Sequence, residues 1–172
     1  MNWLLVYLHL LALAVWSGET VFFGAVVAPA LFGGLDRVEA GNVAALIFPG
    51  YYGLAYACGA LLLATAFGLW QRTRPAGAVW ALAAVIAALM LADCLFAGLY
   101  LLPEADALRP LLHDAAAAAS AQPEFDALHR LSMQLNVAVL AGNLILAGLL
   151  ATRISAGLAP PRRLSRYGER IM

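Results

Sequence analysis

The segment AGAVWALAAVIAALMLADCLFAGLYLL, residues 76–102, decides the fold class because it is long, apolar and almost free of charge. Its 27 residues include a single charged side chain, Asp93. A helix needs about 20 such residues to cross a bilayer. Three further apolar runs cover residues 3–27, 43–70 and 127–152. Because backbone polar groups inside lipid must be satisfied within their own segment, each run should be a helix. The sequence therefore predicts an all-α integral membrane protein, a four-helix antiparallel bundle.

The composition supports one membrane domain and little else. The chain has 172 residues, of which 64% are hydrophobic and 12% charged, whereas soluble domains carry about 25% charged residues. We therefore expect a transmembrane domain over residues 1–152 and a basic tail over residues 153–172. The first run has no basic residue before it and is too long for a signal peptide, so it is expected to remain as a spanning helix. Cys58 and Cys94 lie within apolar runs and are interpreted as small core residues.

Charge placement predicts the orientation. An even number of crossings puts both termini on one side, together with Arg72, Arg74 and the arginines of the tail. Most acidic residues fall in the other two connections. Because basic loops stay in the cytoplasm, both termini are predicted to be cytoplasmic, in the inner membrane of a bacterium. Aromatic belts are expected at the two membrane surfaces, formed on the cytoplasmic side by Trp3, Tyr7, Trp70 and Trp80 and on the outer side by Tyr51, Tyr52 and Tyr100. Residues 109–121 should form a short helix that ends before Pro123.

A few polar side chains inside the apolar runs are the best indications of function. A charge at the bilayer centre costs at least about 2.5–3.5 kcal/mol, so such residues usually face the bundle interior. Helical periodicity brings four of them to facing stripes in the outer half: Glu19, Asp93, His129 and Asn136. They could form an outward-facing site for a proton, a cation or a metal ion. Alternatively, they could be interhelical hydrogen bonds with no further role, the role we expect for Asn143.

The chain resembles a known family in two places. HLLALAVWSGETVFFGAVVAPALF (residues 9–32) with FPGYY (residues 48–52) is similar to the first half of the transmembrane protein 205-like family, and FDALHRLSMQLN (residues 125–136) is similar to its second signature. Members of this family are four-helix membrane proteins whose biochemical role is largely unassigned. The resemblance draws attention to the family-signature positions, which are His9, Trp16, Gly18, Pro29, Phe48, Pro49, His129, Ser132 and Asn136.

The first helix also resembles HemJ-type protoporphyrinogen oxidases and copper-resistance membrane proteins, through His9, Trp16 and Gly18. In the HemJ type the corresponding histidine is associated with haem, so His9 becomes a candidate single-histidine haem or porphyrin ligand. The HemJ pattern also requires a membrane lysine, and this chain contains no lysine.

Three functional hypotheses follow. The first is a non-catalytic accessory or scaffold subunit that contacts the lipid bilayer and associates with other membrane proteins or with itself. The second is a small protein that handles protons, ions or metal through the outer cluster, and the third is a haem binder through His9. No nucleophile motif, phosphate loop or nucleic-acid-binding patch is present, which argues against an enzyme of those classes and against nucleic acid as a partner. Cofactors remain unassigned, since neither haem nor metal is favoured by the spacing of ligands.

Overall fold

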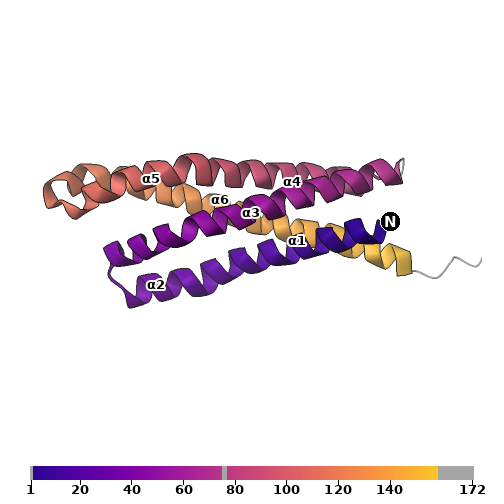
Figure 1. Ribbon diagram of the computed structural model, residues 1–172, viewed down its shortest axis with the longest axis horizontal. Coiled ribbons are helices and arrows are strands. Elements are labelled where there is room, and N and C mark those ends of the chain that lie inside the picture. Colours follow the sequence, from indigo (N-terminus) through magenta and orange to yellow (C-terminus); the bar gives the residue numbers. More distant parts are fainter. Residues whose placement is uncertain (1, 75–76, 159–172) are drawn as a thin grey trace, which may run out of the picture.

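The protein is a bundle of four long helical rods (Figure 1), seen here in a computed structural model that describes residues 2–74 and 77–158. The first rod is α1 (Asn2–Phe22), the π-helical η1 (Phe23–Val27) and α2 (Ala28–Gly34). The second is α3 (Arg37–Thr73). The third joins α4 (Ala78–Phe96), the π-helical η2 (Ala97–Leu101), α5 (Leu102–Leu108) and the 3₁₀ helix η3 (Arg109–His113), and the fourth is α6 (Ala115–Leu158). The prediction of an all-α protein with four membrane-spanning helices is confirmed.

The rods pack in a ring. α3 contacts α1 and α4, and α6 contacts the same two rods from the other side. The start of α1, the end of α3, the start of α4 and the end of α6 lie together at what we call the terminal end (Figure 1). The α2–α3 connection and η3 lie at the opposite end, called the loop end. The predicted tail beyond residue 158 lies outside the described residues.

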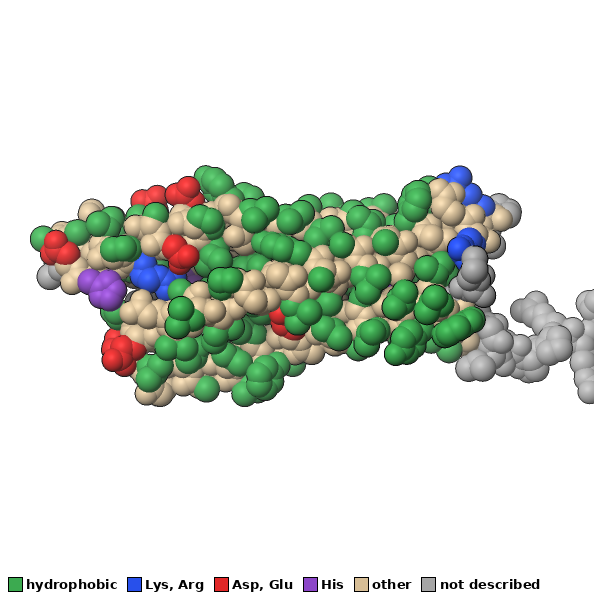
Figure 2. All heavy atoms as spheres, viewed as in Figure 1, with side chains coloured by type: hydrophobic (Ala, Val, Ile, Leu, Met, Phe, Trp, Pro, Cys, Tyr) green, Lys and Arg blue, Asp and Glu red, His purple; other side chains and the backbone are tan. Residues whose placement is uncertain are grey.

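The helices are longer than a bilayer requires. α6 has 44 residues, which at 1.5 Å per residue corresponds to about 66 Å, whereas the hydrocarbon core is about 30 Å thick. Basic side chains gather at the terminal end, and acidic, basic and histidine side chains at the loop end (Figure 2). An apolar belt separates these ends, so the loop end projects beyond the membrane.

The prediction of a short helix over residues 109–121 that ends before Pro123 is wrong. Residues 109–113 form η3, and α6 begins at Ala115 and continues through Pro123. Asp114 starts α6, because its carboxylate accepts a hydrogen bond from the backbone N–H of Ala116 at 3.0 Å. Pro123 removes the donor for the carbonyl of Ala119, but both residues are exposed. Water can therefore satisfy that carbonyl, and the helix tolerates the proline.

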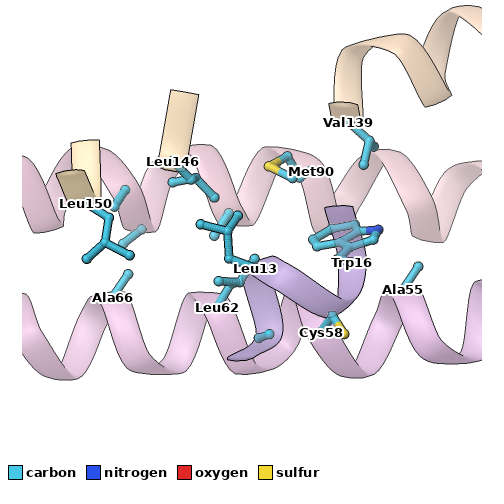
Figure 3. Packing of buried hydrophobic residues seen from close by; sticks show 14 of the residues in the cluster. Leu13, Trp16, Ala55, Cys58, Leu62, Ala66, Met90, Val139, Leu146 and Leu150 are labelled. Carbon is cyan, nitrogen blue, oxygen red and sulfur yellow. The ribbon is translucent and has the colours of Figure 1, made fainter. Parts of the chain in front are cut away.

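Two separate cores hold the rods together. The larger one, called the terminal core, surrounds Trp16, Leu62 and Leu146, which are almost completely buried (Figure 3). The smaller one, called the loop-side aromatic cluster, contains the buried Tyr51 and Tyr52, with Phe23 and Phe48 packed against them. Small residues allow this packing, since a Cβ added at Gly59 would come within 3.1 Å of the Trp16 ring.

The predicted aromatic belts are only partly present. Trp3, Tyr7 and Tyr100 are exposed on the bundle surface as expected. Trp80, Tyr51 and Tyr52 were predicted at the membrane surfaces, but each is only 6% exposed. Hydropathy marks the ends of the spans but does not tell which face of the helix a residue occupies, so the prediction failed for these three.

Candidate functional site

His9 lies in the terminal core, far from the loop end. Its side chain is 1% exposed, and its Nδ1 lies 2.8 Å from the hydroxyl oxygen of Thr65 on α3. That hydroxyl donates to the backbone carbonyls of Leu61 and Leu62 at 2.7 and 3.0 Å. The oxygen of Thr65 therefore accepts a hydrogen bond from His9, whose Nδ1 carries the proton. Trp80 packs edge-on against the imidazole, with ring centroids 5.6 Å apart. The geometry is that of an interhelical hydrogen bond, and the haem hypothesis stays a prediction.

Glu19 is half-buried on α1, one turn before η1. Its Oε2 atom is buried and has no hydrogen-bond partner. Tyr51 and Cys58 of α3 and Cys94 of α4 lie close enough for electrostatic interaction with the carboxylate. Among the described residues, the groups beside Glu19 are therefore apolar or weakly polar, and none of them is a cation.

Asp93 occupies the corresponding place on α4, one turn before η2, and is also half-buried. Its electrostatic neighbours are Tyr52 of α3 and the adjacent Cys94. Cys94 thus interacts with both carboxylates. Within the described residues no hydrogen bond joins Glu19 to Asp93.

Asn136 links the fourth rod to the second. Its Oδ1 accepts a hydrogen bond of 2.7 Å from the hydroxyl of Tyr51, and its Nδ2 donates to the carbonyl of Ser132 at 3.1 Å. Since Tyr51 is also a neighbour of Glu19, this pair connects α1, α3 and α6. From the sequence, Tyr51 is expected only in the aromatic belt at the outer membrane surface. Its place two residues after Pro49, on a long apolar helix, gave no sign that its hydroxyl would be buried.

His129 and Ser132 lie nearer the loop end, beside a small cavity of about 60 Å³. The cavity has room for a few water molecules. His129 is exposed and its ring is parallel to that of Phe125, with centroids 6.5 Å apart. The cavity is lined by Phe48, Tyr52, Leu101, Leu102, Ala105, Arg109, Phe125, Leu128, His129 and Ser132.

Arg109 separates this cavity from a larger open hollow of about 600 Å³, which Asn42, Asp106 and His113 also line. Its guanidinium donates through Nη1 to the carbonyl of Gly41 on α3 and through Nη2 to Asp106 at 2.6 Å. The bond to Gly41 ties the third rod to the second at the loop end, and the bond to Asp106 lies within the third rod.

The four residues predicted as one outer site therefore divide between two places. Glu19, Asp93 and Asn136 adjoin the buried tyrosines, whereas His129 lines the cavity. Among residues 2–74 and 77–158, no three His, Cys, Asp or Glu side chains lie close enough together to hold a metal ion. The structure contains a hydrogen-bonded path that runs from Tyr51 through Asn136 to the backbone carbonyl of Ser132. Ser132 also lines the cavity beside His129.

The remaining family-signature positions are Trp16, Gly18, Pro29 and Pro49. Trp16 is completely buried, and its Nε1 has no hydrogen-bond partner. No atom lies within 4 Å of a Cβ added at Gly18, and Pro29 sits in the first turn of α2. Pro49 lies inside α3. The expected interhelical hydrogen bond of Asn143 is wrong, since its side chain is fully buried and neither amide atom has a partner.

Comparison with known proteins gives one match. A family model described as a domain of unknown function, DUF4149, matches residues 11–113. That range begins at Leu11 within α1, includes Glu19 and Asp93, and ends at the last residue of η3. No curated protein and no solved structure matches the chain.

Proposed function

The chain belongs to the DUF4149 family, a domain of unknown function, and we propose that it is a non-catalytic accessory or scaffold subunit of a membrane protein complex. Its four apolar helices make it a multi-pass protein in contact with the lipid bilayer. The proposal extends to its location, the inner membrane of a bacterium with both termini in the cytoplasm. Arg72 and Arg74, which follow the last buried residues of α3 at the terminal end, support that orientation.

The observation that carries the proposal is the presence of polar atoms at the surface of the apolar belt. Acidic atoms show in the middle of this belt in Figure 2. The acidic residues within the apolar runs 3–27 and 76–102 are Glu19 and Asp93, and both are half-buried. Neither carboxylate has a hydrogen bond or an ion pair in the described part of the chain. Polar groups of this kind are costly in contact with lipid. A helix of another membrane protein would cover the exposed parts of these two side chains.

The test is gentle purification of the full chain from its native membrane. We expect a stoichiometric membrane partner, or a defined oligomer, that is lost or weakened in Glu19→Gln and Asp93→Asn. Leu89→Ala provides a matched control, because Leu89 is 67% exposed on the same helix as Asp93. A monodisperse monomer with no partner, in lipid nanodiscs as in detergent, would contradict the proposal.

A second function, handling of protons or small cations, is favoured by the path from Tyr51 through Asn136 toward the loop-end cavity. Carboxyl and imidazole groups within a membrane can relay a proton when water completes the chain, and the amide of Asn136 holds the phenol of Tyr51 between them. The test is proton or cation flux in proteoliposomes, with Glu19→Gln, Asp93→Asn and His129→Gln combined. We expect flux in the wild-type protein that the triple variant abolishes. Equal flux from both proteins, or from neither above empty vesicles, would exclude this function.

A further inference from the structure

The first and third rods repeat the same sequence of elements. α1, η1 and α2 end at Phe22, Val27 and Gly34, whereas α4, η2 and α5 end at Phe96, Leu101 and Leu108. Each boundary recurs after a shift of 74 residues. The same shift pairs Ala14 with Ala88, Phe22 with Phe96, Gly24 with Gly98 and Pro29 with Pro103. Two antiparallel partners, α3 and α6, pack between these rods, so the repeated rods occupy equivalent places in the ring.

The π-helical segments have the same local cause in both rods. The N–H of Ala28 bonds to the carbonyl of Phe23, five residues earlier, and the N–H of Leu102 bonds to the carbonyl of Ala97. A proline follows directly in each rod. Because proline has no N–H and its ring clashes with the carbonyl four residues before it, a wider turn accommodates it. Single π-helical turns are rare in proteins, and those that occur often lie at functional sites.

The shift of 74 residues also pairs Glu19 with Asp93. Each carboxyl lies one turn before its π-helical segment, is half-buried and has no partner in the described chain. No acidic residue occurs elsewhere in the apolar parts of the two rods, between residues 3 and 29 or between 77 and 103. Each of the two rods therefore carries its one acidic residue of these ranges at the same position of the repeat, in a half-buried place within the apolar run.

A second, independent observation concerns the surroundings of Glu19. Trp16, one turn earlier on α1, is completely buried, yet its Nε1–H donates to nothing. In Figure 3 the indole nitrogen of Trp16 lies on the side of the ring toward Ala55. Residues three apart on a helix are neighbours. An unused buried donor and the buried, unpartnered Oε2 of Glu19 thus lie on adjacent turns of α1.

We propose that α1–η1–α2 and α4–η2–α5 are two copies of one membrane element, and that Glu19 and Asp93 are its duplicated proton-binding carboxyls. Each exchanges one proton with water, so that a neutral carboxyl becomes a carboxylate and a hydronium ion. This inference goes beyond the role of an accessory subunit and does not require a partner or transport across the membrane.

The other titratable groups near the two carboxyls are weak acids. Tyr51 and Cys58 of α3 and Cys94 of α4 face Glu19, and Tyr52 of α3 and Cys94 face Asp93. The fourth rod, α6, contributes the uncharged amide of Asn136 to this region. A fixed positive charge is absent from these neighbours, so nothing there opposes protonation.

The test uses dicyclohexylcarbodiimide, an apolar reagent that modifies protonated carboxyls within membranes. The full-length protein in phosphatidylcholine vesicles is treated at several pH values, and the modified residues are identified by mass spectrometry. We expect modification of both Glu19 and Asp93, which declines as the pH is raised. The exposed acids Glu39 and Glu104, at the loop end, are internal controls that should remain unmodified by the apolar reagent.

Two variants sharpen the result. Glu19→Gln should leave Asp93 as the single modified site, and the exchange variant Glu19→Asp with Asp93→Glu should keep both sites reactive, because the two positions are equivalent. Modification of one carboxyl only in the wild-type protein would overturn the equivalence of the two copies. Modification of neither, or a yield that does not fall at high pH, would overturn proton binding itself.

Discussion

The terminal half and the loop-side half of the bundle are built differently. The terminal core consists mainly of aliphatic side chains and alanines around Trp16, and its hydrogen bond from His9 to Thr65 is internal and complete. The loop-side half contains the aromatic cluster, both π-helical segments and the cavity beside His129. Buried polar atoms without a partner in the described residues occur in both halves, at Glu19 Oε2 here and at Trp16 Nε1 and Asn143 beside the terminal core, so they do not distinguish the two halves. The other differences indicate that the terminal core holds the rods together, while the loop-side half carries the groups available for binding.

The largest effect should follow from Trp16→Ala, because it empties the centre of the terminal core. Trp16 is fully buried, and replacing a buried tryptophan by alanine costs about 3–5 kcal/mol. The free energy of unfolding, measured by titration with sodium dodecyl sulfate, should fall by that amount. Trp3→Ala is the control, since Trp3 is 72% exposed on the same helix. Equal losses for both variants would show that the terminal core does not dominate stability.

Gly98→Ala probes the contact of η2 with the aromatic cluster. A Cβ at Gly98 would lie 2.0 Å from the hydroxyl oxygen of Tyr56 and 2.8 Å from the ring of Tyr52. Overpacking of this kind costs about 1–3 kcal/mol, and the same unfolding titration should detect it. Gly53→Ala, with no atom within 4 Å of the added Cβ, should be neutral or stabilising. A neutral Gly98→Ala would mean that the loop-side half repacks freely.

Thr65→Val tests the internal hydrogen bond of the terminal half. The substitution keeps the shape of the side chain but leaves the buried Nδ1–H of His9 without an acceptor. The expected loss is about 1–2 kcal/mol of unfolding free energy. Thr152→Val is matched to it, because Thr152 is exposed and its hydroxyl bonds only to a carbonyl of its own helix. A loss confined to the control would refute the assigned role of Thr65.

Tyr51→Phe should have a smaller effect in the loop-side half. It removes the hydrogen bond to Asn136, and such bonds between membrane helices average about 0.6 kcal/mol. A double-mutant cycle with Asn136→Ala measures the coupling, and Tyr100→Phe serves as an exposed control. Coupling near zero would show that the pair does not join α3 to α6 in the membrane.

The smallest expected change concerns haem at His9. The imidazole is 1% exposed and already bonded to Thr65, so the absorption spectrum of the purified protein should show no Soret band after haem is supplied. A Soret band that disappears in His9→Ala would reverse this expectation. It would place cofactor chemistry in the half that we regard as structural.

The fold class could be predicted from the sequence, but only part of the candidate site could. Glu19, Asp93 and Asn136 were identified because a polar residue in an apolar run stands out in the sequence itself. Tyr51 was not, since tyrosine is as common at a membrane surface as in a core, and only the neighbouring rods decide which position it occupies. Asn143 shows the opposite error, because a buried amide suggests a hydrogen bond that the packing does not provide. The continuation of α6 through Pro123 was missed because the proline was read as the end of a short helix.

The four apolar rods, the charged ends and the acidic residues between them follow from the sequence alone, because hydropathy is a local property of each segment. The pairing of Tyr51 with Asn136 and of His9 with Thr65 was decided only by the tertiary structure, as was the separation of His129 from Glu19. Such contacts depend on how each helix is rotated and shifted along its neighbours. A displacement of one turn changes every partner while leaving the hydropathy of the segment the same.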